Sequence, residues 1–92
     1  MARSPVSGAQ YALAVSTSVV TLTVPAAANK AEIMVRGDSV AFTRDGTDPT
    51  ASRGIQANVQ DVIMLESRDE CVKFETIRVT GNATLDVEYF TE

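Results

Sequence analysis

The chain has 92 residues and a formal net charge of −4 at pH 7, which suits a single domain. Hydrophobic residues make up 45% and charged residues 22%, a composition typical of a folded globular protein. There is no histidine and only one cysteine, Cys71. Ser-His-Asp and Cys-His nucleophile pairs, imidazole metal sites and an internal disulfide are therefore excluded. We expect no enzyme activity and no cofactor.

The distribution of charge argues against two classes of partner. The eight Lys and Arg residues are scattered singly from Arg3 to Arg78, whereas nucleic-acid binding needs a basic stripe. The N-terminus lacks the basic-then-apolar order of a signal peptide, and no apolar run approaches the roughly 18 residues of a membrane helix. We expect neither nucleic acid nor a membrane as partner, and a protein made in a reducing cytoplasm.

The composition of the whole chain favours strands, because Val and Thr are abundant and Leu is scarce, and its first third shows the strand pattern. Residues 9–24 predict two short strands broken near residues 16–18, and apolar side chains alternate with Thr from Val20 to Val24. Pro25 and the small residues up to Lys30 predict a connection outside the sheets.

The middle of the chain predicts a β-hairpin and a long loop. Apolar residues alternate in 31–36 and again in 40–43, and Gly37-Asp38 supplies turn residues between them, which is typical of a hairpin. Residues 44–54 contain two glycines and a proline, so they predict the longest surface loop.

The last third predicts a buried strand, a helical turn and an amphipathic strand. Residues 62–65 are a short apolar run, consistent with a strand buried on both faces, and residues 55–59 lead into it. The spacing of apolar residues changes near residues 69–75, which indicates a helical turn or bend before a strand from about residue 76. Apolar and polar side chains alternate clearly along residues 83–89, which predicts the amphipathic strand. The whole pattern predicts an all-β domain, either an antiparallel β-sandwich or a small jelly-roll-like barrel of about seven or eight strands.

Several segments of residues 31–90 resemble small head-associated proteins of tailed bacteriophages, of the decoration or cement type. The most specific is the Asp-Gly-Thr-x-Pro-Thr turn followed by a glycine. The segments are residues 42–54, Val62-Ile63-Met64-Leu65, Phe74-Glu75-Thr76-Ile77-Arg78-Val79 and Ala83-Thr84-Leu85-Asp86-Val87-Glu88-Tyr89-Phe90.

This resemblance implies a compact β-sandwich with a structural role on the outer surface of the virion capsid. The expected partner is the major capsid protein, whose neighbouring subunits the chain would bridge. A homo-oligomer is also expected, with a trimer favoured over a dimer. Alternatives are a head–tail adaptor or tail subunit, and a surface-displayed module that binds the host.

The N-terminal segment is a candidate partner-contacting arm, because residues 1–30 carry many apolar side chains and almost no charge. Residues 31–92 would form the body of the sandwich. Most of its side chains would line the protomer's own core; alternatively the arm also contacts a neighbour, where strand addition would cover it. The candidate contact residues are Tyr11, Leu13, Val15, Arg36, Arg44 and Arg53.

Three further motifs have plainer explanations. Arg36-Gly37-Asp38 spells an integrin-binding tripeptide but suits a turn between strands. Asp45, Asp48 and Asp61 could hold a hard cation, but aspartate in a turn commonly bonds its own backbone. Cys71 has no histidine to activate it, so we expect it in or near the core.

Overall fold

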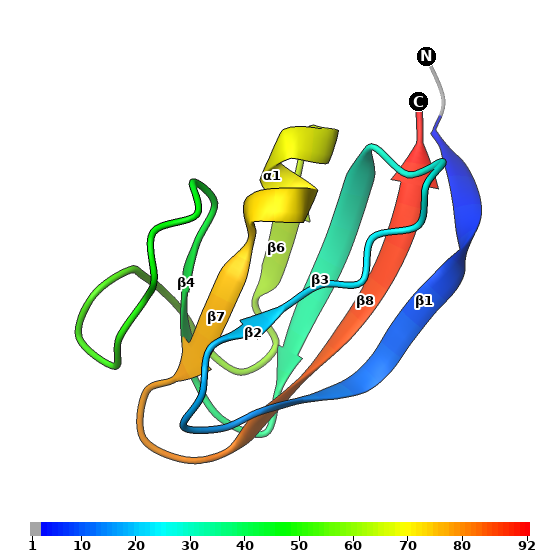
Figure 1. Cartoon of the computed structure of the whole chain (residues 1–92). Helices are drawn as coiled ribbons and strands as arrows, with labels where there is room; N and C mark the ends of the chain where they lie inside the picture. The colour runs from blue at the N-terminus through cyan, green and yellow to red at the C-terminus, as the bar shows by residue number, and fades with distance from the viewer. Residues whose placement is uncertain (1–2) are drawn as a thin grey trace.

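The computed structural model describes residues 3–92, which form two antiparallel four-stranded sheets packed face to face (Figure 1). Sheet A has the strand order β1 (Ser4–Val15), β8 (Ala83–Thr91), β3 (Lys30–Arg36), β6 (Val62–Leu65). Sheet B has the order β2 (Val20–Thr21), β7 (Glu75–Arg78), β4 (Val40–Thr43), β5 (Ile55–Ala57). The predicted all-β sandwich is confirmed.

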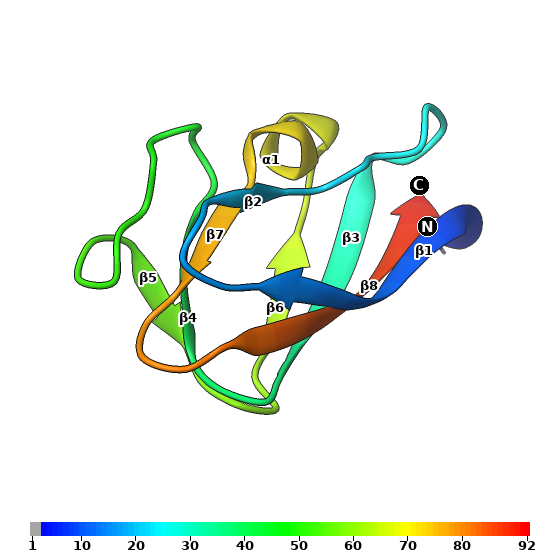
Figure 2. The ribbon, with the colours of Figure 1, turned by 60° about the horizontal axis from the view of Figure 1, so that its bottom comes forward.

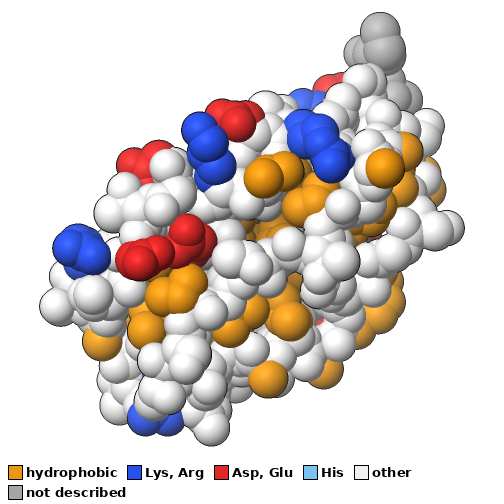
Figure 3. All heavy atoms as spheres, viewed as in Figure 1, with side chains coloured by type: hydrophobic (Ala, Val, Ile, Leu, Met, Phe, Trp, Pro, Cys, Tyr) orange, Lys and Arg blue, Asp and Glu red, His pale blue; other side chains and the backbone are white. Residues whose placement is uncertain are grey.

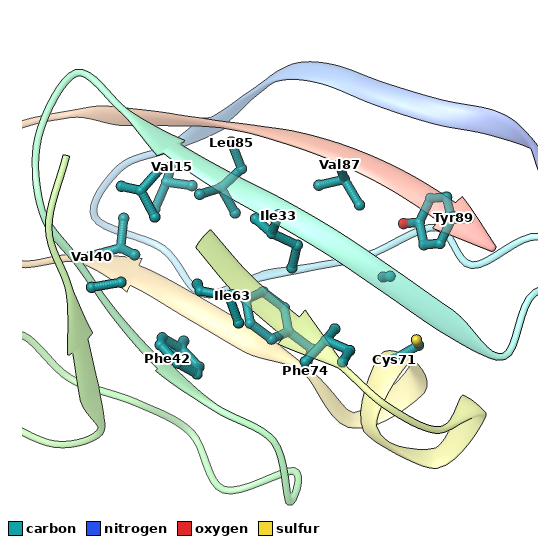
Figure 4. Packing of buried hydrophobic residues seen from close by; sticks show 14 of the residues in the cluster. Val15, Ile33, Val40, Phe42, Ile63, Cys71, Phe74, Leu85, Val87 and Tyr89 are labelled. Atoms are coloured by element: carbon teal, nitrogen blue, oxygen red, sulfur yellow. The ribbon is translucent and has the colours of Figure 1, made fainter. Parts of the chain in front are cut away.

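The core lies between the sheets and follows the alternation of the strands. β8 buries every second residue from Ala83 to Tyr89, as the sequence predicts, and β3 does the same at Ile33 and Val35. Sheet B contributes Val40 and Phe42 to the same cluster. Figure 4 shows these side chains gathered between the two sheets. The two layers therefore share one continuous apolar core.

A short helix, α1 (Arg68–Lys73), confirms the predicted helical turn. Its first turn is capped by Ser67, whose hydroxyl oxygen accepts a hydrogen bond from the Glu70 backbone N–H at 3.2 Å. The helix buries Cys71 completely, and this burial raises the pKa of the thiol. Cys71 is therefore a small core residue, and its thiolate form is disfavoured.

The predicted hairpin of residues 31–43 is wrong, because β3 and β4 belong to different sheets. β3 pairs with β6 and β8, whereas β4 pairs with β5 and β7. The turn between β3 and β4 carries the chain from one sheet to the other, and Gly37 has the left-handed φ of 86° that this turn needs. Glycine-aspartate chemistry suits either kind of turn, so the local sequence could not distinguish them.

The prediction that residues 62–65 are buried on both faces is also wrong. β6 is an edge strand of sheet A and its outer face is uncovered, so Val62 remains 50% exposed. Ile63 and Leu65 point into the core. A continuous apolar run in this short strand therefore reflects one buried face and one exposed face.

The N-terminal segment is not a separate arm. β1 pairs with β8 along its length, from Ser4 opposite Thr91 to Val15 opposite Ala83. Residues 1 and 2 of the predicted arm lie outside the described residues. The predicted break is confirmed, since β1 ends at Val15 and β2 begins at Val20. β1 and β2 are thus the edge strands of their sheets and follow one another along one side of the sandwich (Figure 2).

Candidate docking surface

The outer face of sheet A carries a hollow that combines apolar and acidic side chains. It draws on all four strands, which hold these side chains in fixed register. Met34 lies between Asp86 on β8 and Val62 on β6, and in the next row Glu32 lies opposite Glu88. We call the set that lines this hollow the Tyr11 face: Tyr11, Glu32, Met34, Arg36, Val62, Asp86 and Glu88.

Tyr11 is the most exposed large apolar side chain of the described residues, at 63%. Its hydroxyl donates a hydrogen bond to Glu88 Oε2 at 2.7 Å, and this bond raises the pKa of the phenol. A second hollow, lined by Pro5 to Ala9 and by Phe90, also borders Tyr11 and Glu88. The aromatic ring therefore stands on the sheet between two recesses.

β1 has a β-bulge beside Tyr11. Gln10 pairs with Val87 and Leu13 pairs with Leu85, so β1 has one extra residue over this interval. Ala12 adopts a left-handed φ of 56°, which is unfavourable for alanine. Its backbone N–H donates to Asp86 Oδ1 at 2.9 Å, so a carboxylate on β8 anchors the bulge. The backbone beside Tyr11 is therefore held by a contact with β8.

Asp86 also receives a hydrogen bond from Arg36 Nε. The backbone N–H of Ala12, followed by the Arg36 guanidinium, holds the pKa of this carboxyl below its usual range. The structure thus brings together two of the predicted contact residues, Tyr11 and Arg36, through contacts with β8.

Glu32 and Glu88 face each other directly across β3 and β8, an arrangement that costs stability when both are charged. Arg3 Nη2 lies 3.0 Å from Glu32 Oε1 and offsets one of the charges. The Arg3 guanidinium also lies 4.0 Å from the centre of the Phe90 ring. The Tyr11 face is therefore an apolar floor bordered by carboxylates: Glu32 and Glu88 each have one donor in place, and Asp86 has two.

The other predicted contact residues lie elsewhere. Val15 is completely buried, so its prediction as a contact residue is wrong: the last residue of β1 points into the core. Leu13 is partly buried against the same core. The Arg44 guanidinium lies 5.0 Å from the centre of the Phe42 ring, and Arg53 donates to the carbonyl of Asp48, which stabilises the 44–54 loop.

Glu88, Met34 and Val62 were missed by the sequence analysis. The alternation of residues 83–89 already placed Glu88 on the solvent side of its strand. Nothing local indicated that β6 would lie beside β3, and that neighbour relation is what brings Val62 next to Met34.

The Arg36 side chain of the Arg36-Gly37-Asp38 tripeptide is 61% exposed, but it is not free. Arg36 is bonded to Asp86, and Asp38 Oδ1 accepts a hydrogen bond from the Ser39 backbone N–H at 2.7 Å. The Asp38 carboxylate also fills the space beside Gly81, where an added Cβ would lie 2.3 Å from its oxygen. Both charged side chains are therefore engaged within the fold.

Two of the aspartates considered for a cation, Asp45 and Asp61, are held in separate turns. Asp45 Oδ1 accepts from the Thr47 backbone N–H at 3.0 Å, which lowers the pKa of Asp45. Asp61 Oδ2 accepts from the Asn58 backbone N–H at 2.8 Å. Within residues 3–92, no group of three or more Asp, Glu or Cys side chains is arranged so that it could hold a metal ion.

No helix within residues 3–92 has the length and hydropathy to cross a membrane. No protein-family model matches this chain, and no curated protein or solved structure matches it either.

Proposed function

We propose that this chain is a structural protein of a tailed-bacteriophage virion that decorates the outer capsid surface and cements neighbouring major capsid subunits. It would be made in the host cytoplasm and act only after joining the particle. The resemblance of residues 31–90 to head-associated proteins supports this role. The structural observation that carries the proposal is the Tyr11 face, an exposed aromatic ring held in place on a rigid sheet.

The chemistry of the Tyr11 face favours a protein partner with basic side chains. Tyrosine is enriched among residues that dominate binding energy, and a ring already fixed by Glu88 loses little entropy on docking. Met34 and Val62 provide an apolar floor for the stem of a lysine or arginine. Glu32 and Glu88 would then accept hydrogen bonds from its charged head.

Cementing follows from mass action and needs no reaction. A ligand that binds only the assembled shell stabilises it by about 2.7 kcal/mol per site when its free concentration is 100 times the Kd. A copy that touches two capsid subunits adds this free energy to the cost of separating them. Many weak contacts repeated over a shell would thus resist internal pressure.

The first test is the composition of purified virions of the phage that encodes the chain. We expect the chain at a fixed, high ratio to the major capsid protein. A single ring of copies at the portal would instead identify a head–tail adaptor or tail subunit. Absence of the chain from virions would refute the proposal.

The second test measures binding of purified variants to heads that lack the chain. We expect Tyr11→Ala to weaken binding by at least about tenfold, the range of an aromatic contact residue. Val72→Ala is the matched control, because Val72 is also an exposed apolar residue, at 55%, but lies on α1. Equal effects of both substitutions would rule out the Tyr11 face as the contact surface.

A further inference from the structure

The outer edge of β6 carries backbone groups that do not pair with any strand of the described chain. β6 is the last strand of sheet A, and its one neighbour is β3. The Val35 backbone N–H donates to the Asp61 carbonyl at 3.0 Å, so alternate residues from Asp61 onward bond to β3. The N–H and carbonyl groups of Val62 and Met64 therefore point away from β3, and over residues 3–92 no other strand pairs with β6 on that side.

The four residues of β6 contain nothing that would block pairing at this edge. Edge strands are commonly protected by proline, by charged side chains or by a bulge. Residues 62–65 include neither a proline nor a charge, they pair with β3 in unbroken register, and Val62 is 50% exposed. The next backbone N–H, that of Glu66, is already bonded to Glu70 Oε1 at 2.8 Å. The open stretch therefore offers two N–H groups and two carbonyls.

The other three edge strands are less suited to accept a further strand. In β1, Pro5 has no N–H to donate, and the bulge interrupts the ladder at Ala12, whose N–H is bonded to Asp86. β2 has only two residues and β5 only three. Figure 3 shows the side of the sandwich on which β2 lies, where apolar side chains are scattered among polar atoms. Strand addition is therefore best supported at β6.

The outer side chains of β6 continue the rows of the Tyr11 face. Glu88, Glu32 and Met64 lie opposite one another across β8, β3 and β6, and Val62 lines the hollow itself. A residue of an added strand opposite Met64 would take the next place in this row. Its Cα would lie about 10 Å from that of Glu32, because neighbouring strands are about 4.8 Å apart. A lysine or arginine there can lie along Met64 and reach the Glu32 carboxylate.

The charges around this edge also favour a basic occupant. Asp61 and Glu66, which flank the strand, are both exposed. The nearest cation on the neighbouring strand, Lys30, is already engaged: its Nζ donates to the Glu66 carbonyl at 2.8 Å and lies 3.4 Å from Glu92 Oε1. The edge is therefore acidic, and a segment that carries lysine or arginine complements it.

A second copy of β6 would not supply the required cation. Antiparallel pairing through the same backbone groups places an even-numbered residue of the second copy opposite Met64. The choice is then limited to Gln60, Val62, Met64 and Glu66. None of these is a cation, so the chemistry points to a segment of another protein.

We propose that the partner of the Tyr11 face presents an extended basic segment, which adds to β6 as a fifth strand of sheet A. The segment would bond to the backbone of Val62 and Met64 and place a lysine or arginine opposite Met64. The identity of the partner rests on the proposed function, in which it is a major capsid subunit. Main-chain bonds would fix the direction of the segment, and the carboxylates of the Tyr11 face would select its side chains.

The first test uses the isolated chain and a synthetic peptide, followed by NMR. The probe is the acetylated and amidated heptapeptide Thr-Lys-Val-Lys-Val-Lys-Thr, whose lysines share one face of a strand. We expect the amide resonances of Val62 and Met64 to shift with a Kd of about 1 mM, the scale of four main-chain hydrogen bonds, and their hydrogen exchange to slow. The same peptide with N-methylated lysine amides should bind at least about tenfold more weakly.

Three outcomes of this titration would overturn the proposal. They are equal binding of the two peptides, shifts confined to residues outside β6 and the Tyr11 face, and no shift at about 10 mM peptide, ten times the expected Kd.

Substitutions at Met64 separate main-chain pairing from side-chain contact. Met64→Pro removes one outward N–H but keeps the pairing with β3, because proline is tolerated where its nitrogen faces away from the sheet. It should weaken peptide binding by at least about fivefold, whereas the control Met64→Leu keeps the N–H and should stay within about twofold. If Met64→Pro loses its circular-dichroism spectrum, Val62→Pro at the first residue of β6 replaces it. Equal effects of proline and leucine would overturn the proposal.

Sedimentation equilibrium of the same variants tests the other occupant. If the wild-type chain self-associates and Met64→Pro abolishes this association while Met64→Leu does not, a second copy occupies the edge and the proposal is wrong.

Binding of the Met64 variants to heads that lack the chain distinguishes this inference from the proposed function. We expect Met64→Pro to weaken head binding by at least about fivefold and Met64→Leu to have little effect. If Tyr11→Ala weakens head binding but neither Met64 substitution does, the capsid role stands and strand addition is wrong. If the chain is absent from virions but the peptide protects Val62 and Met64, the β6 site stands and the capsid role is wrong.

Discussion

Replacing Gln10 by methionine tests whether one polar side chain holds β1 and the segment after β2 to the core. Gln10 Oε1 accepts hydrogen bonds from the Tyr89 hydroxyl and from the Thr23 backbone N–H. Tyr89 is only 1% exposed, and its burial raises the pKa of the phenol. Methionine keeps the length of the side chain but removes the acceptor.

The expected loss of stability depends on whether water can replace Gln10 as the hydrogen-bond partner of each donor. Without Gln10, the buried Tyr89 hydroxyl has no partner, which costs about 1–3 kcal/mol. The Thr23 N–H belongs to an exposed residue, so losing its partner adds only about 0.5 kcal/mol. We therefore expect Gln10→Met to lower the free energy of unfolding by about 1.5–3.5 kcal/mol. Tyr89→Phe should cost only about 1 kcal/mol, because it removes the donor itself.

Urea unfolding of the two single variants and the double variant at pH 7 measures the energetic coupling between Gln10 and Tyr89. The double variant should be more stable than the sum of the single losses predicts, by about 1–3 kcal/mol, because no buried donor is left unpaired. In thermal unfolding, each kcal/mol corresponds to a Tm change of about 4–8 °C for a domain of this size. Additivity within about 0.3 kcal/mol would refute this account of Gln10.

Three further outcomes are expected from urea unfolding. Glu75 has a buried carboxylate oxygen without a partner and a pKa raised by its hydrogen bond with Asp48, so its ionised form destabilises the fold. Glu75→Gln should raise the free energy of unfolding by about 1 kcal/mol at pH 7. This gain should shrink as the pH falls toward about 4, because the wild-type carboxyl then takes up its proton. An equal gain at all pH values would contradict this. Ala12→Gly should have a free energy of unfolding within about 0.5 kcal/mol of wild type, or higher, because glycine accepts the left-handed φ. Its control, Ala14→Gly, should lose about 0.5–1 kcal/mol. Equal losses in the two variants would show that the bulge is unstrained. Leu85→Ala in the buried core should cost about 3 kcal/mol, against less than about 1 kcal/mol for the half-exposed Val62→Ala, and a reversal of this order would place the core elsewhere.

The strands were predictable where one face is buried and the other is wet. Residues 83–89 show this alternation in the sequence, and β8 follows it residue by residue. The pairing of strands was not predictable in the same way. Gly37 permits both a hairpin and a crossing between sheets, and only long-range packing of β3 against β8 decides between them. The short apolar run at residues 62–65 likewise carries no sign that β6 lies at an edge.

The candidate surface was predictable only in part. The exposed aromatic Tyr11 and the guanidinium of Arg36 were both identified, but the carboxylates that fix them come from β8, far away in the sequence. Val15 shows the opposite problem, because an apolar residue in an uncharged segment suits an interface and a core equally well. Whether Val15 lies in the core or at an interface depends on the register shift at the β1 bulge, and this bulge is not evident from the sequence.

The position of β8 affects how the protein can be synthesised. It is the last of the eight strands to leave the ribosome, yet it lies between β1 and β3 in sheet A. Until it emerges, β1 has no neighbour to pair with and β3 lacks one of its two. Residues 4–29, which include no charged residue, are therefore translated long before the pairing partner of β1, and folding is completed only after translation of β8.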